Sequence, residues 1–373
     1  MQFSTIYSRV ESLANVTNQR ALIKDAIQIA LYRSTAEDLP YLMTDGYITT
    51  VAPYETGTVT VTNGSKTVTG SGTTFTAAMV SRKFKVSSDN AYYRISAFVS
   101  TTEITLETPY EGTTASAKTY TIFKDEYRLA PDLDVYKVMR QLERQIALTD
   151  IDNTAFDILN PSPISSGQPS ITVLVGTKLD TYTTGTVSVT VNASTVTGVS
   201  TVWTGVEGLA KGSKITIGVY VYTVKSVDSD TQITIYEKAS ATASTSTYSI
   251  SLDNYILQLA SYPDSAKNIY YKYQRLPFIL INDEDVPDLP DQWHHVLITG
   301  GLVWAWELKD KEESKRYQAM FGLEVQEMWG RIGYISVTRN RPRWNQDDIE
   351  MSRLRLGTLQ FPSGYGIPIS YNR

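Results

Sequence analysis

The stretch GTVTVTNGSKTVTG at residues 57–70 sets the architecture of this chain, because it recurs as GTVSVTVNASTVTG at residues 185–198. Apolar and polar residues alternate in both copies, which is the period of a half-buried β-strand. In the first copy Asn63 and Gly64 separate two such runs, and this pair favours a tight two-residue hairpin turn. The first copy therefore predicts a β-hairpin.

The agreement between the two copies continues further along the chain at a nearly constant offset. TEITL at residues 102–106 matches TQITI at 231–235, and YTI at 120–122 matches YSI at 248–250. Ordered agreement at three separate places predicts two copies of one small all-β module, either a barrel or a sandwich of about six short strands.

Each module is expected to bury one large aromatic side chain. Phe75 in the first copy aligns with Trp203 in the second. A unit of this length without disulfides is only marginally stable alone. We therefore expect each module to depend on contacts with neighbouring parts of the chain or with partner chains.

Outside the modules, apolar residues at three- and four-residue spacing predict helices. One helix is expected to begin after a cap at Thr17 or Asn18 and to end near Arg33. A helix pair is expected towards the other end. Its first member begins near Asp291, and its second follows Asp310, whose acidic neighbours have the spacing of a capping box.

The remaining segments have a mixed pattern. Strands are expected at residues 135–139, 171–175 and 268–273, and a short helix is expected after a cap at Asp152. Together these signals predict an α+β fold: a helical core that carries two inserted small all-β modules and ends in an extended C-terminal tail. The expected parts are an N-terminal helical part of the core (1–53), β module 1 (54–124), a mixed core segment (125–181), β module 2 (182–252), a strand with the C-terminal helix pair (253–338) and an Arg-rich tail (339–373).

Composition excludes several kinds of chemistry. The 373 residues include no cysteine, so there is no thiol nucleophile and no Cys-ligated zinc or iron–sulfur cluster. The two histidines, His294 and His295, are adjacent on an expected helix, which favours one packed and one solvent-facing side chain over a metal pair. The acidic runs at 283–285 and 228–230 are more typical of turns than of calcium sites. We therefore predict a protein without metal, cofactor or enzymatic activity.

No segment has the pattern of a membrane span or a targeting signal. The first five residues lack a basic region followed by an apolar one, and the longest apolar run, near residues 296–306, is too short to cross a bilayer. We expect a protein made in a cytoplasm with no membrane contact. Its net charge of −5 argues against neutralising phosphates as its main task.

The region from residue 331 to the end differs from the rest of the chain. It holds seven arginines and no lysine against three acids, with prolines and glycines that prevent a long helix in most of it. Alternating Arg339, Arg341 and Arg343 before Trp344 would permit contact with phosphates. Pairing with carboxylates of another protein chain is the favoured alternative, because the remainder of the chain is acidic.

Four segments of module 1 resemble a module that recurs in neck and tail proteins of tailed bacteriophages: residues 54–59, 70–75, 93–95 and 120–129. The frame around it is similar to podovirus-like head-to-tail adaptor proteins. The similarity is carried by the N-terminal helix with residues 38–42, by the expected strand at 269–273, and by LPDQWH at 289–294, which precedes paired helices. This chain departs from short adaptors by its second module.

The resemblance implies a structural role in the neck or tail of the virion. It implies a dodecameric ring under the portal that connects capsid to tail, lines the DNA channel without sequence-specific binding, and contacts tail nozzle, tail-completion or tail-fibre proteins. It also implies that the C-terminal tail docks on the portal. The candidate docking residues are Arg339, Arg341, Arg343, Trp344, Leu354, Leu356, Phe361 and Tyr365. The alternatives are a host-surface or carbohydrate-binding tail-fibre component and a peptidoglycan hydrolase.

Overall fold

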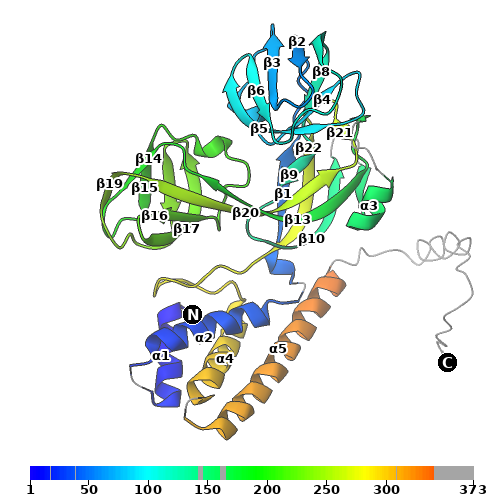
Figure 1. The fold of residues 1–373 in the computed structure, drawn as a ribbon. Helices are drawn as coiled ribbons and strands as arrows, with labels where there is room; N and C mark the ends of the chain where they lie inside the picture. Colours follow the sequence, from blue (N-terminus) through cyan, green and yellow to red (C-terminus); the bar gives the residue numbers. More distant parts are fainter. Residues whose placement is uncertain (17, 38, 142–145, 160–164, 308, 340–373) are drawn as a thin grey trace, which may run out of the picture.

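Helices gather at one end of the molecule and β-sheets form the rest (Figure 1). The computed structural model describes residues 1–339 except 17, 38, 142–145, 160–164 and 308. The helices of the helical end come from both termini of the chain: α1 (Phe3–Ala14), α2 (Arg20–Ser34), α4 (His294–Glu307) and α5 (Lys311–Arg339). Two short 3-10 turns, η1 (Pro40–Leu42) and η5 (Asp291–Trp293), adjoin the helical end. A third, η2 (Ala77–Met79), lies in module 1.

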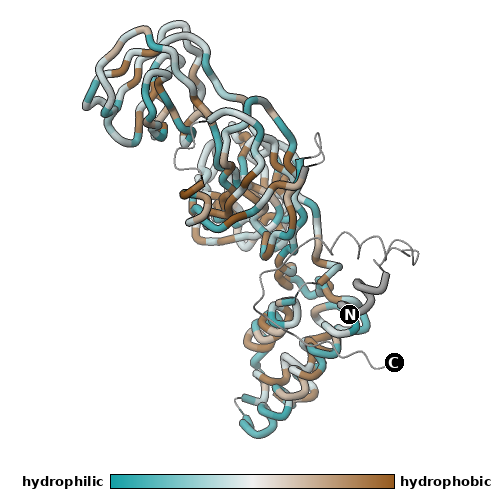
Figure 2. The backbone as a smooth tube through the Cα atoms, turned by 90° about the vertical axis from the view of Figure 1, so that its right-hand side faces the viewer, coloured by the Kyte–Doolittle hydropathy of each residue, from teal (hydrophilic) through white to brown (hydrophobic). Residues whose placement is uncertain are grey.

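Helix α4 is the centre of the helical end, and α1, α2 and α5 pack around it. Nine of its residues are buried. Gly300 lets α2 approach closely, since a Cβ there would lie 2.4 Å from the Cβ of Ala30. Hydrophobic positions recur along these helices where they face one another (Figure 2). The expected helix pair is confirmed as α4 and α5, and Asp310 accepts a hydrogen bond from the Glu312 amide at 3.0 Å as a cap.

Module 1 forms a separate seven-stranded sheet. In sheet order its strands are β7 (Ala115–Lys118), β2 (Thr58–Val61), β3 (Thr67–Ser71), β6 (Glu103–Leu106), β5 (Tyr93–Ser100), β4 (Lys83–Val86) and β8 (Tyr120–Phe123). Tyr54, just before β2, bridges Ile122 of β8, so the sheet curls until its two sides approach. Phe75 is buried in this core, as its position predicted.

Module 2 repeats that strand order. Its strands, again in sheet order, are β19 (Ala243–Ser246), β14 (Thr186–Val189), β15 (Thr195–Val199), β18 (Gln232–Ile235), β17 (Tyr220–Ser229), β16 (Lys214–Ile217) and β20 (Tyr248–Leu259), with the turn η4 (Trp203–Gly205). Tyr182 pairs with Ile250 as Tyr54 does with Ile122. Trp203 is fully buried and its indole N–H donates to the Tyr248 hydroxyl at 3.0 Å.

The backbone path repeats as closely as the strand order. Positive φ angles are costly for residues other than glycine, yet they occur at matching positions in both modules. The matched pairs are Gly57 and Gly185, Gly64 and Asn192, Gly72 and Ser200, and Ala117 and Thr245. The two modules therefore share one detailed fold despite limited identity.

The strands outside the modules join into a central sheet. Its strands are β1 (Met43–Thr49), β22 (Asn268–Arg275), β10 (Leu133–Gln141), β11 (Ile146–Asp150) and β13 (Ile171–Tyr182), and β13 pairs with β20 of module 2. β9 (Glu126–Arg128) also pairs with β20. Smaller elements nearby are α3 (Asn153–Leu159), β12 (Ser166–Gly167) and β21 (Tyr262–Pro263). The Asp152 carboxylate accepts from the Ala155 amide at 2.9 Å, which confirms that cap.

The expected fold class is therefore wrong. The chain is mostly β, and one 13-stranded mixed sheet runs through the central strands and module 2, so a helical core with small inserted modules does not describe it. The physical reason is that strands distant in sequence pair with one another, as β10 pairs with β22. Alternation within each segment indicates a strand but not its partner. The predicted extended tail lies outside the described residues except for Arg339, which ends α5.

The two modules are attached to the central sheet in different ways. β20 continues without interruption from module 2 into the central sheet, paired along its length with β13. The corresponding strand of module 1 is interrupted, because β8 ends at Phe123 and β9 begins at Glu126. Phe123 stacks on Tyr262 at this junction, with ring centroids 4.3 Å apart. Module 1 thus depends more on side-chain contacts for its orientation.

Candidate functional site

Only one of the candidate docking residues lies in the part of the chain that the structure describes. Arg339 is the last residue of α5, and its side chain is not described. The other candidates, from Arg341 to Tyr365, lie outside the described residues. Their role stays a prediction.

The two histidines do not form a reactive pair. His294 is buried, and its Nε2 lies 2.8 Å from the Leu289 carbonyl oxygen. His295 is exposed and its Nδ1 lies 2.9 Å from the Gln292 carbonyl oxygen, so the prediction of one packed and one solvent-facing side chain is confirmed. Burial lowers the pKa of His294, which favours its neutral form.

Carboxylates of both acidic runs accept hydrogen bonds in or beside turns, as predicted. Asp285 accepts hydrogen bonds from the amides of Ile281 and Asn282 at 2.8 and 2.7 Å. Asp228, beside the β17–β18 turn, accepts from the Thr234 hydroxyl at 2.6 Å. Among the described residues, no group of three or more acidic or histidine side chains could hold a metal ion. In the same part of the chain, no helix is long and apolar enough to cross a membrane.

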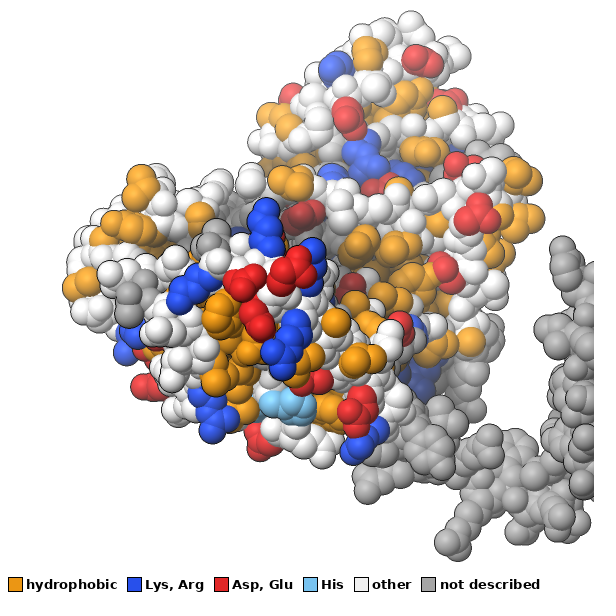
Figure 3. All heavy atoms as spheres, turned by 90° about the horizontal axis from the view of Figure 1, so that it is seen from below, with side chains coloured by type: hydrophobic (Ala, Val, Ile, Leu, Met, Phe, Trp, Pro, Cys, Tyr) orange, Lys and Arg blue, Asp and Glu red, His pale blue; other side chains and the backbone are white. Residues whose placement is uncertain are grey.

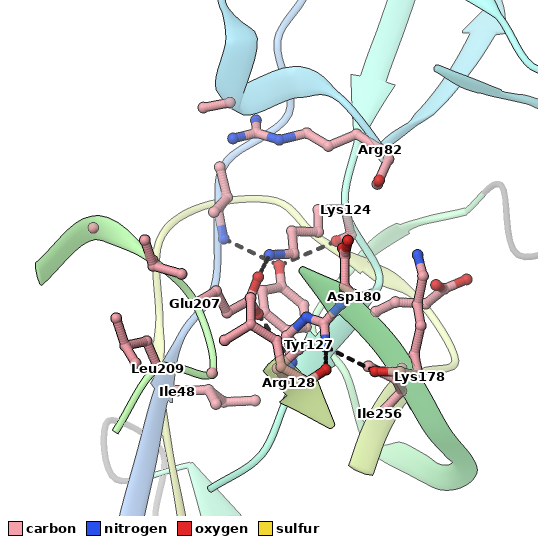
Figure 4. Close-up of a pocket in the computed structure, with 18 of the residues that line it drawn as sticks. Ile48, Arg82, Lys124, Tyr127, Arg128, Lys178, Asp180, Glu207, Leu209 and Ile256 are labelled. Carbon is pink, nitrogen blue, oxygen red and sulfur yellow. Dashed lines mark hydrogen bonds and ion pairs between the residues drawn. The ribbon is translucent and has the colours of Figure 1, made fainter. Parts of the chain in front are cut away.

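A cleft of about 800 Å³ lies where module 1, module 2 and the central sheet meet (Figure 4). Its walls come from β1, the turn before β4, residues 124–128, β13 and the loop at residues 204–210. Charged side chains dominate the part of the cleft between the modules. This site was not predicted from the sequence.

Behind one wall of the cleft, Lys83 and Asp125 form an ion pair with 2.6 Å between Nζ and Oδ2. Both residues are buried, with 4% and 1% of their surface exposed. Gln258 of β20 also donates to Asp125, at 3.1 Å. Burial raises the pKa of Asp125, although the Lys83 ammonium acts in the opposite direction. A buried pair of this kind is costly to break, because the remaining charge would lack a partner.

The other three carboxylates of the cleft also have cationic partners. Glu126 pairs with Arg94 at 2.7 Å. Burial alone would raise the pKa of Glu126, but the hydrogen bond and charge of Arg94 lower it overall. Asp180 pairs with Arg128 at 3.1 Å, and Glu207 pairs with Lys124.

Glu207 of module 2 holds the segment that leaves module 1. Besides its ion pair with Lys124, its carboxylate accepts from the Arg128 amide at 2.9 Å. The Arg128 guanidinium in turn donates to the carbonyls of Lys178 and Leu252 at 3.0 and 2.9 Å. These contacts set the orientation of module 1 against module 2 and the central sheet.

Gly208 allows the loop of Glu207 to approach β20. It has φ +84°, and a Cβ there would lie 2.6 Å from the Oδ1 of Asn254. The Asn254 amide donates to the carbonyls of Gly208 and Leu129 at 3.0 and 2.9 Å. A side chain at position 208 would therefore disturb the packing of this loop against β20.

Arg82 is the exception in this cleft. Its guanidinium extends along the upper side of the cleft, opposite Glu207 and Lys124 (Figure 4). Its Nε is enclosed and has no hydrogen-bond partner among the residues that the structure describes. Burial lowers the pKa of Arg82. The sequence signal that could have indicated this region is the charged run KDEYR at 124–128. It aligns with the less charged LDNYI at 252–256 in the second copy.

The helical end leaves apolar side chains exposed on its outer helices. On α2 these are Leu22, Ile29 and Tyr32, and on α5 they are Met320 and Leu323, the last with 68% of its surface exposed. α2 and α5 both pack against α4, and the Trp329 indole of α5 donates to the Ser34 carbonyl of α2 at 2.8 Å. Seen from below, the helical end shows hydrophobic side chains between lysine, arginine and acidic groups (Figure 3).

Four separate hydrophobic cores lie in the helical end, module 1, module 2 and the central sheet. Residues 168–347 match the family model of the SU10 adaptor protein, over less than half of the 373 residues. The matched region includes β13, module 2, β22 and the α4–α5 pair. The match supports a family of phage structural adaptors. A search of curated proteins finds no match.

Proposed function

We propose that this protein is a structural head-to-tail adaptor of a tailed bacteriophage. In this proposal, copies of the chain form a ring of twelve under the portal that connects the capsid to the tail and surrounds the DNA channel. The observation that carries the proposal is the family match, which covers the continuous path from β13 through module 2 to the α4–α5 pair. The role is structural and not enzymatic.

Ring formation is supported by the apolar side chains on the two outer helices. A closed ring needs two different faces on each subunit, which meet in a heterologous contact. The exposed side chains on α2, such as Ile29, and those on α5, such as Leu323, lie on different helices of one bundle. Burying them between neighbouring subunits would stabilise the ring by the hydrophobic effect.

The charge of the chain suits a channel through which DNA passes. The net charge is −5, so the bulk of the ring would repel phosphates and let DNA slide. The β modules would project away from the helical end and contact tail nozzle, tail-completion or tail-fibre proteins. The arginine-rich tail at residues 339–373 would dock on the portal through Arg–carboxylate pairs and apolar anchors such as Trp344.

Co-sedimentation with the cognate portal tests the proposal. The full chain should sediment with the portal. A chain that lacks residues 339–373 should keep its fold but should no longer sediment with the portal. The melting curve of the truncated chain checks the fold. Retention of the truncated chain on the portal would contradict the role of the tail, and failure of the full chain to bind would contradict the adaptor role.

A further inference from the structure

The cleft between the modules is lined by two cations, Arg82 and Lys178, that form no ion pair with the residues that the structure describes. Each lining carboxylate already pairs with a lysine or arginine, as described above for Asp125, Glu126, Asp180 and Glu207. Arg82 lines the same cleft, and no residue in the described part of the chain accepts a hydrogen bond from its side chain. A guanidinium offers five N–H donors, and leaving the enclosed Nε–H of Arg82 without an acceptor costs free energy.

The second module shows that the fold does not require an arginine at this position. Arg82 follows Ser81, which has φ +69°, and its equivalent Ser213 follows Gly212, which has φ +98°. The carbonyl of Arg82 accepts from the Ile95 amide at 2.9 Å, and that of Ser213 accepts from the Val224 amide at 2.8 Å. The backbone is the same with a serine, so the long cationic side chain of Arg82 has another role.

We propose that this cleft binds an acidic segment of a partner protein, with one carboxylate of that segment held by the Arg82 guanidinium. The planar guanidinium matches a carboxylate with two parallel hydrogen bonds. Lys178, on the β13 wall of the cleft, adds a second positive charge for a neighbouring acid.

The surroundings of Arg82 favour a protein segment over a nucleic acid. Four carboxylates line the cleft, and they would repel the closely spaced phosphates of a nucleic acid strand. A protein segment can place a single carboxylate at Arg82 and neutral groups beside Glu207. This inference goes beyond the proposed adaptor function, and it holds whether or not the chain forms a ring.

Binding of a fluorescein-labelled GSEESG peptide, which has two acids between neutral residues, to the full chain is followed by fluorescence anisotropy and tests the inference. We expect saturable binding that weakens as salt is raised. Arg82→Ser, which installs the residue that module 2 has at Ser213, should weaken binding roughly tenfold. Lys85→Ser is the matched control, because Lys85 is a partly exposed cation of β4 in the same module and does not line the cleft.

Several outcomes would overturn the inference. These are no binding of the GSEESG peptide, equal affinity of the wild type and Arg82→Ser, and an equal loss of affinity in Lys85→Ser. Equal binding of a GSQQSG peptide, in which glutamines replace both acids, would show that carboxylates are not recognised. Displacement of the peptide by an equal concentration of inorganic phosphate would show a site for small anions in place of a partner segment. Unchanged melting of Arg82→Ser is the check that the variant folds.

Discussion

Lys83 and Asp125 form a buried ion pair at the point where module 1 joins the central sheet, with 2.6 Å between Nζ and Oδ2. Lys83 is the first residue of β4, and Asp125 lies between β8 and β9, where the strand that is continuous in module 2 is interrupted. The pair thus ties module 1 to the segment through which it is attached. Several consequences of this arrangement can be measured.

Replacing Lys83 by methionine should loosen the junction. Lys83→Met leaves Asp125 buried without its cation, which typically costs about 3–5 kcal/mol. Hydrogen exchange measured by mass spectrometry should become faster over residues 120–128. Lys214→Met is the matched control, since Lys214 begins β16 in module 2 and donates to the Thr223 hydroxyl at 2.6 Å. Equal changes in the two variants would contradict a special role for the buried pair.

Glu126 should make the stability of module 1 depend on pH. Its folded pKa is below its ordinary value of 4.5, so its contribution is present above pH 4.5 and is lost as the pH falls through the folded pKa. Glu126→Gln should therefore lower the melting temperature most near neutral pH. The difference from the wild type should shrink as the pH is lowered below about 4.5. A difference that stays constant between pH 7 and pH 3 would argue against this assignment.

Glu207 should restrict the angle between the modules. Glu207→Gln weakens the contact with Lys124 and Arg128, so module 1 should sample more orientations. Because the chain has no cysteine, spin labels can be placed at Lys66 and Lys238, one exposed position on each module.

The distance distribution between these labels, measured by double electron–electron resonance, should broaden in Glu207→Gln. Glu111→Gln is the control, because Glu111 is an exposed acid of module 1 that does not line the cleft. An unchanged distribution in Glu207→Gln would show that other contacts fix the modules.

Gly208 should tolerate a side chain less well than another glycine with positive φ. Gly208→Ala adds the cost of left-handed backbone, roughly 1–2 kcal/mol, and a clash with Asn254 at 2.6 Å. Gly218→Ala has only the backbone cost, since a Cβ at Gly218 meets open space at φ +62°. The melting temperature should fall further in Gly208→Ala, and equal melting temperatures would contradict the close approach.

The sequence predicted local elements well where the periodicity was strong. The alternation in residues 57–70 indicated β2 and β3, and the spacing after Asp310 indicated α5. Helix α1 was missed, although Phe3, Ile6 and Val10 have helical spacing and are all buried. The extent of each module as a domain stays a prediction.

Non-local relationships could not be predicted from this single sequence. The pairing of β10 with β22 joins segments that lie far apart in the chain. Local periodicity indicates that a segment is a strand but does not indicate which strand it pairs with. The cleft was missed for the same reason, because Lys124 meets Glu207 only after both modules have folded. A comparison of the two copies points to it, since KDEYR at 124–128 replaces the less charged LDNYI at 252–256.

The most direct measurement of the central claim is electron microscopy of the purified full chain, alone and mixed with the portal. The adaptor account predicts rings with a central hole, seated on the portal with their axes aligned. Isolated single chains that do not assemble even in the presence of the portal would contradict it.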